Sequence, residues 1–336
     1  MALLTVSGSP HIHGDWTVRQ IMFSVVYALI PAFLVSIYFF GAQALVLTAI
    51  SVASCLLFEF LIQKYLLKGE VTITDGSAVV TGILLAFNVP SNLPIWILVI
   101  GAFIAIGISK MAFGGLGHNI FNPALVGRVF LLISFPVHMT TWPVPRPLFA
   151  RHLPEAITGP TTLGIIKEGI KAGKTIPELS SQIPGYVSDL LGNHGGSLGE
   201  VSAVALILGA IFLFARRIIT WHIPVAYLAS VIVFTGILWL INPMIYMNPL
   251  IHLITGGLML GVFFMATDMV TSPMSAWGMI IFGLGCGIIT ILIRVWGSYP
   301  EGVSFAILIM NAFVPLINRA FKPRRFGRRV IMVTDK

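Results

Sequence analysis

Long apolar runs separated by short polar breaks constrain this chain more than any other feature of its sequence. A helix needs about 20 apolar residues to cross the hydrocarbon of a bilayer, and several runs reach that length. Hydrophobic residues make up 57% of the 336 positions and charged residues only 10%, which excludes an ordinary water-soluble domain. Ten runs can be counted, at about 17–40, 43–67, 76–90, 93–113, 118–135, 197–215, 219–242, 250–266, 276–297 and 303–318. The sequence therefore predicts an all-α polytopic membrane protein with about ten transmembrane segments.

The ten runs form two sets of five that resemble each other. A Thr-Gly pair precedes a polar break in each half, at Thr81-Gly82 and at Thr255-Gly256, and a basic residue ends the fourth run of each, Lys110 and Arg294. The third and fifth runs of each set are shorter than the others. Since five is an odd number, the second set would enter the membrane in the opposite orientation. This pattern predicts two inverted five-helix repeats with half-helices, as in urea transporters.

Basic residues predict how the chain lies in the membrane. Positive charges close to a span resist translocation and favour anionic headgroups, so the basic tail is expected in the cytoplasm. Ten spans then place the N-terminus there too. The tail also explains much of the net charge of +8 without any nucleic-acid partner. The predicted parts are a cytoplasmic N-terminal segment (1–16), a first membrane repeat (17–135), an exported loop (136–196), a second membrane repeat (197–318) and the basic cytoplasmic tail (319–336).

The exported loop contains the short polar sequence Thr158-Gly159-Pro160-Thr161. Gly permits a positive φ and Pro fixes φ near −65°, so this sequence is typical of an ordinary turn. The run from Leu163 to Ala172 has helical spacing. We therefore expect an exposed, flexible turn at Thr161 followed by a helix, on the side of the membrane where water-soluble chemistry can be attached.

Polar residues inside the membrane blocks gather in the glycine-rich stretch 110–124. Lys110, Asn119 and Asn122 are its polar members. We expect Asn119 to head a half-helix, where it would supply a cap and free amide donors. Polar groups at an edge with apolar walls suit a planar polar ring, although a capped helix packed through glycines explains the stretch equally well. Other ionisable residues at membrane depth are Glu59, Asp75, Arg128 and Asp268, and such groups are costly in lipid unless they face a cavity or a partner.

Neither a metal site nor a catalytic residue of the chain's own is predicted. The two cysteines, Cys55 and Cys286, lack the spacing of iron–sulfur ligands. The pair His11 and His13 offers only two ligands, which make a poor metal site. Any redox centre must therefore come from another source.

Several stretches resemble the RnfD/NqrB family, which comprises the D subunit of Rnf complexes and the B subunit of sodium-pumping quinone reductases. They are Asp75-Gly76-Ser77 through Thr81-Gly82 to Pro90, the Gly-Gly-x-Gly-x-Asn-x-Phe-Asn-Pro-Ala sequence at 114–124, and Phe135-Pro136 before Met139-Thr140-x-Trp142. In this family a flavin transferase modifies the last Thr of an acidic-x-x-Ser/Thr-Gly/Ser-Ala/Pro-Thr motif. That Thr matches Thr161, with Glu155 where Asp is usual and Pro160 where Ala is common. The chain lacks the longer N-terminal extension of the quinone-reductase subunit, which favours Rnf.

The resemblance implies two flavins. FMN would be joined through a phosphoester to Thr161, with Thr158 and Gly159 as the rest of the motif. A noncovalent riboflavin would lie among the spans. The candidate residues for this second flavin or for a polar cavity are Lys110, Asn119, Asn122 and Asp268.

The resemblance also implies a function and partners. The chain would be a flavoprotein subunit, not catalytic alone, that passes electrons between ferredoxin and NAD branches while Na⁺ or H⁺ is translocated. Its partners would be the FMN-bearing G subunit, the membrane A/E and C subunits, the flavin transferase and membrane lipid. Its location would be the cytoplasmic (inner) membrane of a bacterium or archaeon.

Two other functions stay open at this point. A facilitator for a small neutral solute is one, because urea-channel-like folds share the two inverted repeats. Asn122-Pro123-Ala124 and Asn248-Pro249 are also similar to the paired Asn-Pro-Ala boxes of aquaporins. The equivalent subunit of a Na⁺-translocating NADH:quinone reductase is the other. Yellow colour or flavin fluorescence of the purified chain distinguishes a flavoprotein from a channel.

Overall fold

The computed structural model describes residues 16–69, 71–145, 158–180, 195–200 and 202–322, together with positions 183, 185, 190 and 192. His11, His13, Glu155 and most of the basic tail lie outside these ranges. Helices dominate these described residues, and six of those helices are long and apolar enough to cross a membrane. The chain is therefore a multi-pass membrane protein.

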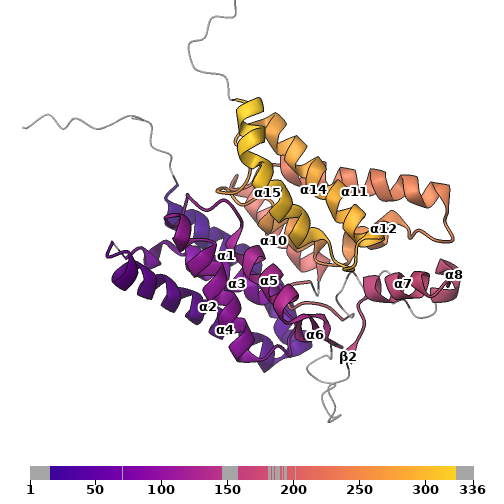
Figure 1. Cartoon of the computed structure of the whole chain (residues 1–336), viewed down its shortest axis with the longest axis horizontal. Coiled ribbons are helices and arrows are strands. Elements are labelled where there is room, and N and C mark those ends of the chain that lie inside the picture. The colour runs from indigo at the N-terminus through magenta and orange to yellow at the C-terminus, as the bar shows by residue number, and fades with distance from the viewer. Residues whose placement is uncertain are drawn as a thin grey trace, which may run out of the picture.

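The first half of the chain forms the indigo-to-magenta part of Figure 1. Its helix α1 begins at a capping box, in which the Thr17 side chain accepts from the Gln20 amide and the Gln20 side chain accepts from the Thr17 amide. Its short helix α5 begins at Asn122, with Pro123 in the first turn. The elements are α1 (Val18–Phe40), α2 (Ala42–Leu61), η1 (Ile62–Leu66), η2 (Ile73–Asp75), α3 (Ser77–Phe87), α4 (Ile95–Phe103), η3 (Ile104–Ile108), η4 (Met111–Phe113), α5 (Pro123–Ser134) and α6 (Pro136–Thr140).

The second half contains the same kinds of element, with one broken helix. Thr255-Gly256-Gly257 separates α12 from α13, and both glycines have positive φ, a conformation that residues with a side chain rarely adopt. The elements are α10 (Ala203–Ala215), α11 (His222–Ile241), α12 (Pro249–Ile254), α13 (Leu258–Leu260), η6 (Gly261–Met265), α14 (Ala276–Trp296) and α15 (Val303–Ala320).

A small layer connects the halves. Strand β1 (Trp142–Pro143) pairs antiparallel with β2 (Thr158–Gly159), and helices α7 (Thr162–Lys171) and α8 (Ile176–Leu179) follow. The described chain is thus all-α except for this two-residue ladder. Figure 1 shows α7 and α8 beside the end of the second half, away from α1 to α4.

Corresponding helices of the two halves pack against each other. The first helices, α1 and α10, are in contact, and so are the fifth, α5 and α15. Within the halves α2 packs on α4 and α11 packs on α14. Gly209 of α10 lies so close to the Ala28 carbonyl of α1 that a β-carbon there would clash. The two inverted repeats remain a prediction.

The segment lengths predicted from the sequence were only partly correct. Beside the six candidate spans, three apolar helices are shorter, namely α3, α5 and α10. Helix α15 has 18 residues, so the expectation that the fifth run of each set is short is wrong for the second half. Thr81-Gly82 lies inside α3, whereas Thr255-Gly256 lies at a helix break, so these two pairs are not structurally equivalent. Ten full spans remain a prediction.

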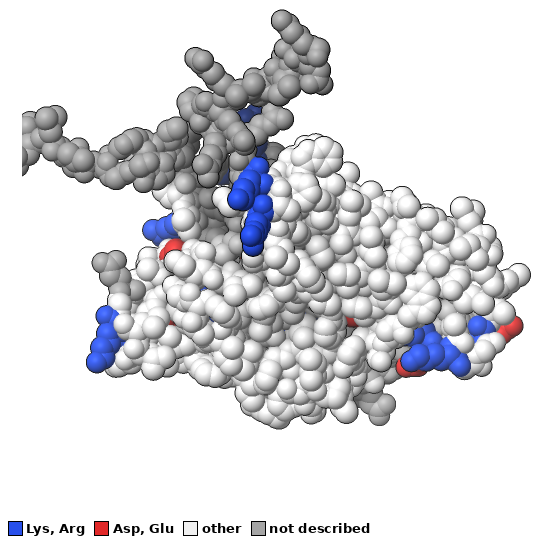
Figure 2. Space-filling model, turned by 45° about the horizontal axis from the view of Figure 1, so that its top comes forward, with Lys and Arg blue, Asp and Glu red and all other residues white. Residues whose placement is uncertain are grey.

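A wide part of the surface carries almost no charge. Figure 2 shows basic side chains, with some acidic ones beside them, at the margins of a face that is otherwise almost uncharged. Large apolar side chains are exposed on the long helices, among them Leu34 of α1 and Leu240 of α11. Lipid, which needs no polar partner, is the environment that such a face requires.

Candidate functional site

Thr161 is the residue that begins helix α7. Its Oγ1 accepts a hydrogen bond from the backbone amide of Gly164 at 3.1 Å, which is the usual arrangement of a helix N-cap. The β1–β2 ladder holds the preceding Thr158-Gly159 against Trp142-Pro143. The motif Thr158-Gly159-Pro160-Thr161, which was expected to be an unconstrained turn, therefore connects the β1–β2 ladder to helix α7.

The prediction that Thr161 is exposed on a flexible segment is wrong for this structure. Only 7% of Thr161 is exposed, while Thr158 is exposed. The capping bond turns the Thr161 hydroxyl towards the helix. A β-carbon placed on Gly195 would lie 3.5 Å from the Gly159 carbonyl oxygen, so the chain around Gly195 packs over the motif.

Both apolar and basic side chains of helix α7 contact the second half of the chain. Leu163 and Ile166 pack with Met247 and Ile251 of the second half. The Lys167 ammonium donates to the carbonyl oxygens of Ile293 at 3.2 Å, Arg294 at 3.1 Å and Tyr299 at 2.7 Å. These carbonyls lie in or just after the last turn of α14, where a cation is favoured by the helix dipole.

Sequence reasoning missed Lys167. One lysine among three in the exported loop carries no signal of its role, because its acceptors are backbone groups 126 to 132 positions away. A second cavity of about 240 Å³ lies beside it, lined by Lys167, Tyr246, Arg294 and Trp296 among others.

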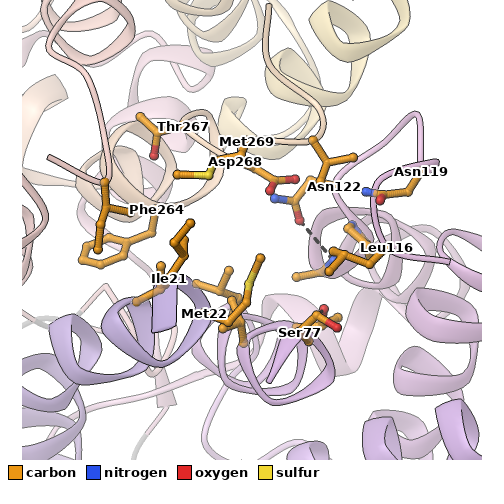
Figure 3. Close-up of a pocket in the computed structure, with 18 of the residues that line it drawn as sticks. Ile21, Met22, Ser77, Leu116, Asn119, Asn122, Phe264, Thr267, Asp268 and Met269 are labelled. Atoms are coloured by element: carbon orange, nitrogen blue, oxygen red, sulfur yellow. Dashed lines mark hydrogen bonds between the residues drawn. The ribbon is translucent and has the colours of Figure 1, made fainter. Parts of the chain in front are cut away.

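The residues proposed for a second flavin meet in one cavity. Lys110, Asn119, Asn122 and Asp268 all line a space of about 80 Å³ between the two halves (Figure 3). Ile21 and Met22 of α1 and Phe264 of η6 supply apolar walls. The sequence therefore selected side chains that share a site, although they come from widely separated positions.

The two asparagines differ in what they contact. Asn122 caps α5, because its Oδ1 accepts from the amides of Ala124 and Leu125. The Asn119 amide nitrogen donates to the Phe121 carbonyl, but its buried Oδ1 has no partner among the described residues. The expectation that Asn119 heads the half-helix is therefore wrong, since Asn122 does.

The size of the cavity limits what it holds in this conformation. Typical small-ligand sites have roughly 300 Å³ or more, so a space of about 80 Å³ does not admit a three-ring flavin as it stands. Met22 and Met269 line it, and methionine side chains change rotamer at low cost. The unpartnered Oδ1 of Asn119 suits the edge of a flavin, whereas the volume does not fit the ring without such a rearrangement.

The remaining ionisable residues at membrane depth are paired. Glu59 forms a buried ion pair with Lys110 at 2.7 Å. Asp75 Oδ1 accepts from the amide and hydroxyl of Ser77, and Asp268 accepts from the Thr271 hydroxyl. Arg128 lies away from the cavity, on Asn88 and Glu301.

Comparison with known proteins gives consistent results. The chain matches the model of the NQR2, RnfD, RnfE family over residues 5–327. It is 46% identical to the D subunit of the Na⁺-translocating ferredoxin:NAD⁺ oxidoreductase complex of Acetobacterium woodii, with 96% of this chain and 95% of that protein covered. It is 43% identical to the D subunit of the proton-translocating ferredoxin:NAD⁺ oxidoreductase complex of Clostridium ljungdahlii, with 97% of each covered. The D subunit of the ion-translocating oxidoreductase complex of Stutzerimonas stutzeri is 40% identical, with 93% of each covered.

Proposed function

The chain belongs to the NQR2, RnfD, RnfE family, and we propose that it serves as the D subunit of an Rnf-type, ion-translocating ferredoxin:NAD oxidoreductase complex. It is a subunit of an oxidoreductase and not an enzyme alone. The relatives reported above are named as ferredoxin:NAD or ion-translocating oxidoreductase subunits, which favours Rnf over a quinone reductase. Those names include both sodium and proton translocation, so they leave the coupling ion open.

We propose that FMN is joined to Thr161 through a phosphoester. The observation that carries this proposal is that Thr161 is the N-cap of a ten-residue helix. A phosphate on Oγ1 would stand at the positive end of the helix, where backbone amides without intrahelical partners favour anions. The Gly164 amide, 3.1 Å from Oγ1, is one such donor. A bound flavin accepts and releases one or two electrons reversibly. Helix α7 would fix where that flavin lies.

The burial of Thr161 bears on when the flavin is attached. The transferase needs the hydroxyl, and the segment at Gly195 packs over the motif. We infer that attachment precedes this packing or accompanies an opening of the first turn of α7. Either order leaves Thr161, rather than the exposed Thr158, as the acceptor that the family motif selects.

The second, noncovalent flavin is proposed for the cavity around Asn119. Its support is the unpartnered Oδ1 of Asn119 beside Lys110 and Asp268. Helix α3 runs between this cavity and the side of the protein on which Thr161 lies. Ser77 at its start lines the cavity. The carbonyl of Phe87 at its end accepts from the amide of Gly199, in the segment whose residue Gly195 packs over the Thr161 motif. Eleven helical residues span roughly 16 Å. The two flavins would therefore lie on opposite sides of the membrane block.

The proposed topology places both termini in the cytoplasm and the layer with α7 outside, in an inner membrane. It agrees with the positions of three basic residues: Arg19 in the first turn of α1, Arg216 directly after α10 and Arg319 in the last turn of α15. Both native cysteines are buried, so cysteines introduced at Gly195 and Lys336 can be labelled with little background. They are expected to react from opposite sides of the membrane; labelling of both from one side would refute this topology.

A fluorescence test decides the proposed function. The full-length chain is made with and without a flavin transferase and run on a denaturing gel. A fluorescent band is expected only with the transferase and is lost in Thr161→Val, which keeps the side-chain shape and removes the hydroxyl. Thr162→Val is the matched control and should keep the fluorescence. Fluorescence that survives Thr161→Val would reject the assignment.

A further inference from the structure

Three charged side chains meet where the two halves join, on the side of α3 opposite the cavity. Arg128 of α5 belongs to the first half, while Glu301 lies between α14 and α15 and Glu200 precedes α10. One atom, Arg128 Nη2, contacts both carboxylates: it pairs with Glu301 Oε2 and lies 3.8 Å from Glu200 Oε1. Arg128 Nη1 donates to Asn88 Oδ1 at 2.7 Å. The side chains of Arg128, Glu200 and Glu301 are 5%, 2% and 11% exposed.

Several polar atoms in this cluster lack a partner. Glu200 Oε1, Glu301 Oε1 and Arg128 Nε have no hydrogen bond to any residue that the structure describes. Glu200 gives the clearest case, because only 5% of the whole residue is exposed. Its unpartnered oxygen is also the one that faces Arg128. An unsatisfied buried polar group costs about 1–3 kcal/mol, more when charged. The geometry therefore requires an additional donor at the two carboxylates.

A second arginine lies nearby; its two terminal nitrogens donate to backbone carbonyls, and its buried Nε has no partner among the described residues. Arg294 Nη1 donates to the His252 carbonyl at 2.6 Å, and Nη2 donates to the carbonyls of Thr255 and Gly256 at 2.9 and 3.0 Å. These carbonyls end α12, so much of the Arg294 charge balances the negative end of that helix. Within the described residues, Arg128 donates a hydrogen bond to Glu301, whereas Glu200 Oε1 receives none. Among these residues, the Glu200 carboxylate is therefore balanced only by the longer-range attraction of Arg128 and Arg294, with an oxygen that accepts no hydrogen bond.

We propose that Glu301 and Glu200 form a proton-binding site that holds one exchangeable proton between the two halves. The proton comes from water on the side of α7 and binds a carboxylate oxygen of Glu301. No bond between heavy atoms forms or breaks and no electron moves, so release simply returns the proton to water. Binding changes the unpartnered Oε1 of Glu301 from an acceptor into a donor and removes the repulsion between the two buried carboxylates. This site goes beyond the proposed electron transfer and does not depend on either flavin.

Electrostatics place this exchange near neutral pH. Burial, and after it the neighbouring Glu200, raise the pKa of Glu301 from 4.5 to about 7, against the opposing effects of Arg128 and Arg294. The charged groups that act on Glu301 are thus one carboxylate, that of Glu200, and two guanidinium groups, those of Arg128 and Arg294. The site should be largely protonated at pH 6 and largely ionised at pH 8.

Infrared difference spectra of the purified full-length chain in lipid nanodiscs test the site, with glutamate carrying a ¹³C label in the carboxyl group. We expect a protonated-carboxyl band that responds to the label and to D₂O, and whose amplitude falls as pH rises through about 7. Glu301→Gln should abolish that pH-dependent component. Glu200→Gln removes the like charge and should move its midpoint down by about one pH unit or more. Glu178→Gln, at an exposed capping position of α8, is the control and should change neither.

Two outcomes would overturn the proposal. One is a titrating band that keeps its amplitude and midpoint in Glu301→Gln. The other is the absence of any glutamate titration between pH 5 and 9 in the unsubstituted chain. Glu301→Asp covers the case in which the Gln variant does not fold. It keeps the carboxyl group but shortens the side chain, so the band should persist with a shifted midpoint; an unshifted midpoint would also reject Glu301.

Discussion

Lys110 Nζ lies 2.7 Å from Oε2 of Glu59, and both side chains are almost completely buried. The same ammonium donates to Glu59 Oε1 at 2.9 Å and to the Ser77 hydroxyl at 2.6 Å. Three donors thus have three acceptors. Gln63 also donates to Glu59, at 3.3 Å, so the pair joins α2, α3 and the segment after η3 in one network.

Breaking this pair should destabilise the protein strongly. Lys110→Met leaves the Glu59 charge buried without its partner, which costs about 3–5 kcal/mol. The Lys110→Met/Glu59→Met double variant removes both charges and should recover much of that loss. Thermal unfolding in one detergent, followed for the two single variants and the double, measures the coupling. Additive losses would show that the ion pair contributes nothing beyond its separate side chains.

Lys167 should hold the proposed flavin-bearing helix in place. Lys167→Met removes hydrogen bonds from a charged donor, worth about 2 kcal/mol, so backbone deuterium exchange in α7 should rise roughly tenfold or more. Lys171→Met, on the same helix but exposed, should change exchange little. Equal rates in the two variants would mean that apolar packing alone fixes α7. Covalent flavin on Thr161 should survive both changes, because neither removes the acceptor hydroxyl.

Asn119 and Asn122 should respond differently to substitution. Asn119→Leu removes the unpartnered oxygen that faces the cavity, so acid extraction of the pure chain should release less noncovalent flavin. Asn122→Leu removes the cap of α5, which costs about 1 kcal/mol, and should lower the unfolding temperature more than Asn119→Leu does. Unchanged extractable flavin in Asn119→Leu would place the second flavin elsewhere.

The sequence predicted the elements that depend on local chemistry. Apolar length predicted α1, α2, α11 and α14 within a few residues, and helical spacing predicted α7. Lys110, Asn119, Asn122 and Asp268 were candidates because lipid penalises polar groups, and all four line one cavity. The same reasoning also selected Arg128, which lies elsewhere.

One wrong prediction had a local signal against it, whereas the other features depend on distant partners and could not be predicted. The choice between Asn119 and Asn122 as the cap of α5 is decided by Pro123 in the first turn, a signal that the sequence did contain. The burial of Thr161 is different, since it requires the segment at Gly195 to fold over the motif. The contacts of Lys167 with α14 and of Arg128 with Glu301 join positions more than 100 residues apart, and no local pattern reports them.

The central claim is that one hydroxyl, that of Thr161, carries the FMN. Peptide mass mapping of the full-length chain, produced together with its flavin transferase, tests it most directly. Thr158, Thr161 and Thr162 lie within five positions, so fragmentation must assign the adduct to a single residue. We expect a mass increase of one esterified FMN on Thr161, absent from Thr161→Val and retained in Thr162→Val. An adduct on the exposed Thr158 or on Thr162, or no adduct in the presence of an active transferase, would contradict it.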